Sequence, residues 1–147
     1  MKAKEFLQQI KKLDRLIINK RIEIRQLKEI ANGGNAGAMT GDKVQSTPNP
    51  QRSADAIAHY IDLEREILQH INELLEARRA VIAVIEQLNT TEYDVLHKIY
   101  VQNITFQDVA TIYDRTYGWA TTVHGRALKN VQRILDEREK GATDGRT

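Results

Sequence analysis

The chain has 147 residues, no cysteine, and 22 Lys and Arg against 20 Asp and Glu, which gives a formal net charge of +2 at pH 7. The absence of cysteine excludes disulfides and thiolate metal sites. Hydrophobic residues make up 41% of the chain and charged residues 29%, with only two prolines, and this mixture favours long helices over strands. We therefore expect an all-α protein of one domain or two small ones.

The sequence gives no sign of export or of membrane insertion. Its apolar runs are all shorter than the roughly 18 residues that suggest a membrane-spanning helix. The opening MKAKEFLQQI has helical spacing and lacks the apolar core of a signal peptide. We expect a cytoplasmic protein without a membrane partner.

The first predicted helix runs from about Ala3 to Ala31. Its apolar residues keep a 4-3 spacing, which indicates a seam between packed helices. Lys20 fills the one polar position of this seam, and we interpret it as a register-setting residue and not as a catalytic lysine. Gly33 and Gly34 are expected to end the helix. The seam consists of Phe6, Ile10, Leu13, Ile17, Ile24 and Leu27.

Residues 32–52 are rich in Gly, Asn, Ser, Thr and Pro, and they predict a long flexible loop. The second helix is expected to begin at Ser53, a good N-cap with Asp55 in the first turn, and to end near Leu88. Together, residues 1–88 predict a long antiparallel hairpin that resembles a coiled coil.

The second predicted helix carries two adjacent apolar seams. One is enough to bury the first helix, so the other needs a further partner, either a second copy of the chain or the C-terminal unit. We assign it to self-association, with a dimer favoured. His70 lies in register with that seam and is interpreted as a packed or interface histidine, because no metal-ligating partner is expected beside it. The first seam is Ile57, Ile61, Leu68, Ile71, Leu75, Ile82 and Ile85. The second is Leu63, Ile67, Leu74, Ala77, Val81, Val84 and Leu88, of which Leu63, Ile67, Leu74 and Val81 are the predicted oligomer interface.

Residues 89–140 fit three short helices. Asn89 and Thr91 each offer a cap with an acid three residues later, so the start of the first helix stays open between them. Thr105 is expected to cap the second helix and Thr116 the third, with Gly141 ending the third and residues 141–147 forming a disordered tail. The expected inward side chains are Tyr93, Leu96, Ile99, Tyr100, Val109, Ala110, Ile112, Ala120, Val123, Ala127, Leu128, Val131 and Leu135.

The spacing within residues 106–125 is typical of a helix-turn-helix. This motif needs a small residue where its helices cross, which Ala110 supplies, and a turn residue that tolerates positive φ, for which Asp114 is suited. Ala120 and Val123 are the contacts through which the recognition helix returns to its support. An ordinary amphipathic helix pair can imitate this pattern, and the basic residues of 115–133 can also be a solvated helix face.

A helix-turn-helix places the N-terminal part of its recognition helix in the major groove. Trp119 has two readings, since it either half-buries against the first helix of the unit or lies on the DNA backbone. His124 is interpreted as a surface or packing residue. The residues assigned to base contacts are Thr116, Tyr117, Thr121 and Thr122. Those assigned to phosphate contacts are Thr105, Gln107, Arg115, Arg126 and Lys129.

The stretch NITFQDVATIYDRTYGWATTVHGRALKNVQRIL resembles region 4 of sigma-70 factors. The shared features are a supporting helix that begins Thr-Phe-Gln-Asp, the following Val-Ala pair, and a recognition helix that runs into Arg-Ala-Leu. The resemblance implies a sigma-like DNA-binding unit.

Nearly the whole chain is also similar to a family of small proteins from phages and prophages of Gram-positive bacteria. The markers are KEFLQQIKKLDRLI, the Pro-containing loop, IDLEREI and HGRAL. By similarity to late-gene activators of the RinA and ArpU type, the resemblance implies transcriptional regulation of phage genes in a bacterial host. The turn departs from the family pattern, because DRTYGW stands where members more often have Gly-Tyr-Ser-Tyr-Arg-Trp. Gly118 therefore receives no base contact.

Three functions compete on this sequence. The leading one is a sequence-specific transcriptional regulator that binds double-stranded DNA, with host RNA polymerase as a further candidate partner. The second is a phage DNA-packaging recognition subunit, and the third is a protein-interaction module that grips polymerase or another protein. We expect no enzyme, catalytic residue, cofactor or metal, because no nucleophile with a base, carboxylate pair or phosphate loop is recognisable.

Overall fold

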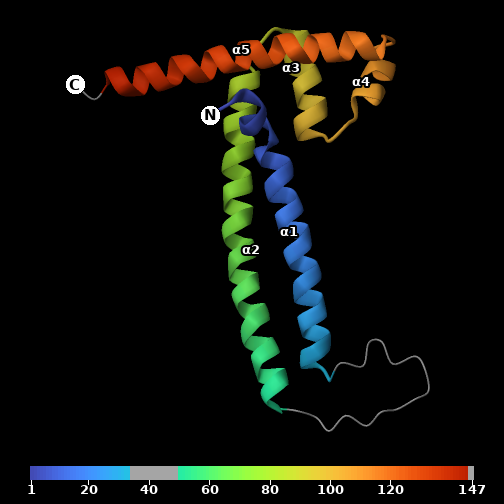
Figure 1. Ribbon diagram of the computed structural model, residues 1–147, viewed down its shortest axis with the longest axis vertical. Coiled ribbons are helices and arrows are strands. Elements are labelled where there is room, and N and C mark those ends of the chain that lie inside the picture. Colours follow the sequence, from blue (N-terminus) through green and yellow to red (C-terminus); the bar gives the residue numbers. More distant parts are fainter. Residues whose placement is uncertain (34–49, 146–147) are drawn as a thin grey trace. The chain divides into compact units, whose positions relative to one another are not determined.

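The computed structural model describes residues 1–33 and 50–145. These ranges contain helices and no strand, which confirms the all-α class. The chain divides into two compact units, of which unit 1 is Met1–Lys12 with Leu74–Thr147 and unit 2 is Leu13–Glu73. The elements in chain order are α1 (Ala3–Ala31), α2 (Pro50–Ile85), α3 (Thr90–Leu96), the π-helical turn η2 (His97–Val101), α4 (Phe106–Ile112) and α5 (Tyr117–Asp144) (Figure 1). None of these helices is long and apolar enough to cross a membrane.

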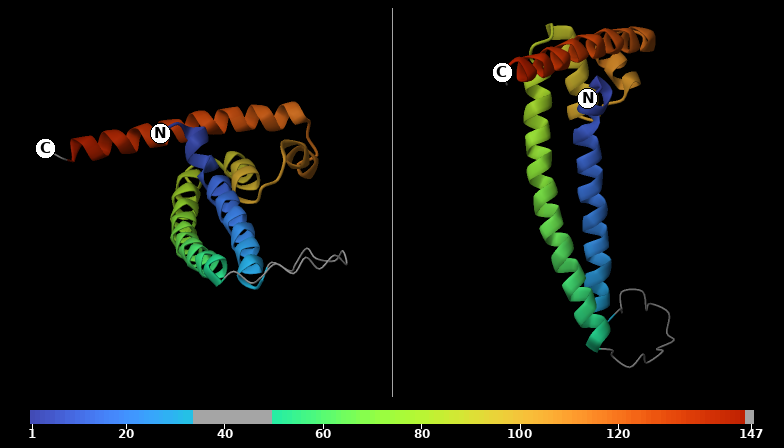
Figure 2. Two further views of the ribbon diagram at one scale, coloured as in Figure 1. Left: turned by 60° about the horizontal axis from the view of Figure 1, so that its bottom comes forward. Right: turned by 60° about the vertical axis from the view of Figure 1, so that its left-hand side comes forward.

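In unit 2, α1 and α2 run side by side in opposite directions (Figure 1 and Figure 2). This pairing confirms the predicted helical hairpin. Lys20, at the polar position of the α1 seam, donates a hydrogen bond of 2.5 Å to Glu66 in α2. The hydrogen bond and charge of Lys20 hold the pKa of Glu66 below its usual value. The apolar side chains that this unit buries are Ile17, Ile24, Ala56, Leu63 and Ile67.

The two seams of α2 are exchanged relative to the sequence-based expectation. Leu63, Ile67 and Val81, predicted to face another copy of the chain, are 6%, 8% and 0% exposed within a single chain. Leu74 is half-buried and packs against the core of unit 1. These positions are therefore covered within one chain. Leu74 and Val81 pack in the core that also contains the C-terminal helices, the other partner that the sequence had left open. Part of the other seam is exposed instead: Ile57, Ile61, Leu68 and Leu75 are between 39% and 64% exposed, whereas Ile85 at its end is 0% exposed.

Unit 1 is built around one apolar core in which α5 is the longest element. Figures 1 and 2 show α3 and α4 packed on one side of α5. The first turns of α1 belong to the same core through Phe6, Leu7 and Ile10, and the end of α2 adds Val84 and Ile85. The helix-turn-helix unit therefore includes residues 1–12 and 74–88, which the expected division into 1–88 and 89–140 assigned to the hairpin.

The start of the chain is also held to α5 by polar contacts. The backbone N–H of Ala3 donates to Oε1 of Gln132 at 2.8 Å, and the amide of Gln132 donates to the carbonyl of Met1 at 3.3 Å. The α-amino group of Met1 lies 3.2 Å from a carboxylate oxygen of Glu139. A sequence pattern gives no signal for such contacts, since they join residues more than 120 positions apart.

Several element boundaries differ from the expectation. α2 begins at Pro50 and not at Ser53, because proline has no N–H to leave unpaired and is well suited to the first turn of a helix. α5 continues past Gly141 to Asp144, since a glycine inside an exposed helix costs only about 1 kcal/mol. The predicted flexible loop 32–52 lies mostly outside the described residues, as do the last two residues of the predicted tail.

Candidate nucleic-acid interface

Each helix of the helix-turn-helix unit begins at a side-chain cap. Asn89 accepts a hydrogen bond from the N–H of Glu92 at 2.9 Å, which decides between the two expected starts of α3. Thr105 accepts from Asp108 at 3.1 Å and begins α4. Thr116, likewise, begins α5. These caps satisfy N–H groups that have no partner inside the helix.

The first helix of the unit does not run on as a regular α-helix. α3 ends at Leu96, and η2 follows as a π-helical turn in which the N–H of Gln102 donates to the carbonyl of His97 at 3.0 Å. This turn brings Ile99 and Tyr100 into the core, as expected, and also buries Val101. Asn103, with φ of 60°, then turns the chain toward α4, a second left-handed residue that the sequence reading missed.

The turn between α4 and α5 has the geometry that the spacing predicted. Asp114 has a φ of 53°, in the left-handed region that Asp tolerates better than most residues. Ala110 and Ala120 are 1% and 0% exposed, so both helices approach closely at these positions. Ile112 was expected to be buried but is 57% exposed, whereas Val109 and Ala110 carry the buried side of α4.

The predicted base-contacting residues lie together on the first turns of α5. The hydroxyls of Thr121 and Thr122 both donate to the carbonyl of Gly118, at 3.0 and 2.8 Å. Each threonine therefore offers a partner only an acceptor lone pair and a methyl group. Thr116 is partly engaged, because its oxygen accepts from the N–H of Trp119 at 3.1 Å. Tyr117 is 54% exposed.

The predicted phosphate-contacting residues are exposed on α4, on α5 and on the turn between them. Arg126 and Lys129 project from α5, Gln107 from the first turn of α4, and Arg115 from the turn itself. Thr105 is exposed as the cap of α4. These side chains belong to unit 1 together with Thr121 and Thr122. Their contact with DNA stays a prediction.

Aromatic side chains of this unit pack between α5 and the segments that precede it, η2 and α4. The half-buried Trp119 ring lies 5.0 Å from the ring of Tyr113, which agrees with the packing interpretation of Trp119. His124, half-buried on the opposite side of α5, lies 2.6 Å from the Tyr100 hydroxyl and 4.9 Å from the Phe106 ring centroid. Burial, with a smaller effect from a lysine of α1, lowers the pKa of His124. The packing interpretation of His124 agrees with these contacts.

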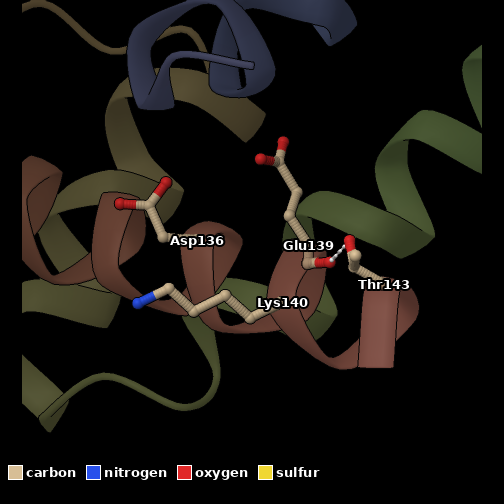
Figure 3. Close-up of a pocket in the computed structure, with 4 residues that line it drawn as sticks. All are labelled: Asp136, Glu139, Lys140 and Thr143. Atoms are coloured by element: carbon tan, nitrogen blue, oxygen red, sulfur yellow. Dashed lines mark hydrogen bonds between the residues drawn. The ribbon is translucent and has the colours of Figure 1, made fainter. Parts of the chain in front are cut away.

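Two further features were considered as sites, His70 and a hollow on α5. His70 has a neighbour that the sequence reading did not expect, since Nδ1 lies 3.3 Å from a carboxylate oxygen of Glu73. Within residues 1–33 and 50–145, no group of three or more His, Asp or Glu side chains is placed to hold a metal ion. An open hollow of about 550 Å³ lies along the C-terminal part of α5. Figure 3 shows the four side chains that line it, all of which come from this helix. They are Asp136, Glu139, Lys140 and Thr143, and the Thr143 hydroxyl donates to the Glu139 carbonyl.

Comparison with known proteins shows a sequence similarity to one bacterial protein. The chain is similar to the RNA polymerase sigma factor SigO of Bacillus subtilis (strain 168), with 23% identity over 101 residues. The match covers 69% of this chain and 52% of that protein, so the chain spans about half the length of its relative. No family model matches the chain, and no solved structure does.

Proposed function

We propose that this chain is a sequence-specific DNA-binding transcriptional regulator. The observation that carries the proposal is the α4–α5 corner, in which Asp114 is left-handed, Ala110 and Ala120 are buried at the crossing, and the outer face of α5 is exposed. A second support is the similarity to a sigma factor, a class of protein that acts in transcription. The regulated genes are those of a phage or prophage, late genes in particular, a proposal that rests on the resemblance described above.

The recognition surface works by dividing its contacts between bases and phosphates. Thr121 and Thr122 enter the major groove, where their methyl groups meet thymine methyls and their oxygens accept from base amino groups. Arg126 and Lys129 lie one to two turns further along α5 and neutralise phosphates, which releases condensed counterions. Thr105 and Gln107 hold a second stretch of backbone from the start of α4.

The protein acts as a dimer in this proposal. The exposed seam of α2, rather than the buried one, supplies the interface. Ile57, Ile61, Leu68 and Leu75 follow one another at 4- and 7-residue intervals, the spacing of a helix seam that meets another helix. A two-fold dimer of helix-turn-helix units reads two half-sites, so the operator is expected to be an inverted repeat.

A second candidate function is binding to RNA polymerase. The observation that favours it is the name of the relative, an RNA polymerase sigma factor, of which this chain matches about half. The same α4–α5 corner would then hold the polymerase in addition to DNA or in place of it. A DNA-packaging role is a further outcome, and it would be recognised by a high-order ring in solution.

The experiment is selection of bound fragments from the genome of the source organism, followed by sequencing. The proposal expects enrichment of a short motif upstream of genes. Enrichment at a single packaging site would move the function to DNA packaging. Absence of salt-sensitive binding to any fragment, together with retention of RNA polymerase on the immobilised protein, would replace the proposal with the polymerase-binding role.

A further inference from the structure

One chain of contacts in unit 1 runs from α3 to the turn of the helix-turn-helix. Tyr113, the residue before the left-handed Asp114, donates its hydroxyl proton to Oδ2 of Asp94 in α3. The ring of Tyr113 lies 5.0 Å from that of Trp119, with the two planes inclined by 48°. The Tyr113 side chain is therefore held at its hydroxyl by α3 and faces the first turn of α5 with its ring.

Asp94 is itself fixed on its other oxygen. Lys98 donates to Oδ1 at 2.8 Å, and the same ammonium lies 5.9 Å from the centre of the Tyr113 ring. Burial disfavours ionisation of Asp94, but the hydrogen bonds from Lys98 and Tyr113 outweigh it and hold its pKa below the usual value. At neutral pH the Tyr113 hydroxyl thus meets a charged acceptor, which makes a stronger hydrogen bond than a neutral one.

Trp119 in turn supports Arg115. The backbone N–H of Arg115 donates to the carbonyl of Ala110 at 2.8 Å, which fixes the main chain of this residue. Its guanidinium carbon lies 5.9 Å from the centre of the Trp119 ring, within the range of a cation–π contact. An arginine that is supported in this way loses less rotamer freedom when it meets a phosphate.

We propose that Asp94 and Tyr113 are positioning residues for DNA binding: they set the Trp119 ring so that it presents the Arg115 guanidinium to a backbone phosphate. This rests on the proposed function, because it assumes that Arg115 contacts DNA. It assigns an indirect part to a residue of α3 and to the residue that precedes the turn, and it makes Trp119 a support for the phosphate contact.

The test is a double-mutant cycle on a mixed-sequence duplex, measured as affinity against salt concentration. Arg115→Ala removes the phosphate contact and should lower the slope of log affinity against log salt by about 0.9. Tyr113→Phe keeps the ring and removes only the hydroxyl, and it should cause a several-fold loss of affinity with part of the same change in slope. In the Arg115→Ala background, Tyr113→Phe should cause no further loss. Tyr93→Phe, the same change at a half-buried tyrosine outside this network, is the matched control.

A second readout needs no DNA. Trp119 is the one tryptophan of the chain, so its emission reports on this network directly. Tyr113→Phe and Asp94→Asn should both shift the emission at neutral pH, while Tyr93→Phe should not. Either variant serves if the other fails to fold.

The outcomes distinguish a failure of the positioning of Arg115 from a failure of DNA binding itself. Positioning is refuted if the loss of affinity in the double variant is the product of the losses caused by Tyr113→Phe and Arg115→Ala alone. It is also refuted if neither Tyr113→Phe nor Asp94→Asn shifts the Trp119 emission. If the unmodified protein binds no duplex while the emission shifts as expected, the network exists but the proposed function fails, and the DNA role of Arg115 fails with it.

Discussion

The hydroxyl of Tyr100 in η2 lies 2.6 Å from Nε2 of His124 in α5, and the two rings stack with their centres 5.7 Å apart. Burial raises the pKa of Tyr100 to about 12, so the phenol keeps its proton at neutral pH. Lys11 lies 5.4 Å from the centre of the Tyr100 ring. Burial, and to a smaller extent the charge of Lys4, lowers the pKa of His124 and so favours its uncharged form.

The stability of unit 1 should therefore fall as the pH is lowered through the ordinary titration range of histidine. The pKa of His124 in the folded chain lies below its unfolded value of 6.5. Around and below that pH the unfolded chain therefore binds more protons, and lowering the pH stabilises the unfolded chain relative to the folded one. His124→Gln should be less stable at neutral pH but lose less stability between about pH 7 and about pH 5. Urea unfolding at several pH values measures this. His59→Gln, at an exposed histidine of α2, is the control, and an unchanged pH slope in His124→Gln would contradict the account.

The start of α1 should be needed for the helix-turn-helix unit to fold. Leu7 is 0% exposed in the core that also holds Val131 of α5, so Leu7→Ala should lower the free energy of unfolding by about 2–5 kcal/mol. Trp119 fluorescence during urea unfolding follows this unit alone. Leu16→Ala, at a 38% exposed leucine of the same helix, should have a much smaller effect. A Trp119 transition that is indifferent to Leu7→Ala would show that the first turns of α1 are dispensable.

The two seams of α2 should respond differently to a charge. Leu68 is 64% exposed, so Leu68→Glu should leave the helix content intact and abolish self-association. Leu63 is 6% exposed inside the hairpin, where an ionised carboxylate is costly, so Leu63→Glu should reduce the helix content itself. Light scattering and circular dichroism on both variants make the comparison. A Leu68→Glu chain that associates like the parent would remove the exposed seam from the interface.

Local sequence signals predicted the C-terminal unit well because its geometry is set by neighbouring residues. A cap such as Thr105 and a left-handed residue such as Asp114 act within one turn of chain, and both lie where the pattern placed them. The first helix was predicted to its boundaries for the same reason, since Ala3 and Gly33 bracket a 4-3 repeat in which Lys20 is the one polar position.

The choice between the two seams of α2 could not be made in this way. Both seams have helical spacing, and which one is buried depends on the partner helix, whose direction and rotation no local pattern encodes. Leu63 and Ile57 illustrate this, since both are apolar and lie on adjacent faces, yet only the first is covered. Contacts such as Ala3 with Gln132 are equally invisible, because they depend on how distant segments pack.

The base-contacting face should discriminate between sequences. Thr122→Ala removes an exposed methyl and an acceptor, and it should weaken binding to the selected operator by roughly 1–3 kcal/mol but change binding to random duplex little. Replacing operator thymines by deoxyuridine tests the methyl part separately. Equal affinities of Thr122→Ala and the parent for the operator would show that the recognition surface lies elsewhere.

The most direct test of the central claim is the salt dependence of duplex binding by the unmodified protein and by Arg126→Ala. DNA binding through the outer face of α5 predicts a log–log slope that falls by about 0.9 when Arg126 is removed, on operator and random duplex alike. Lys140→Ala carries the same change of charge at the far end of α5 and should leave the slope close to that of the parent. Binding without salt dependence, or equal slopes for the parent and Arg126→Ala, would contradict the assignment of this face to DNA.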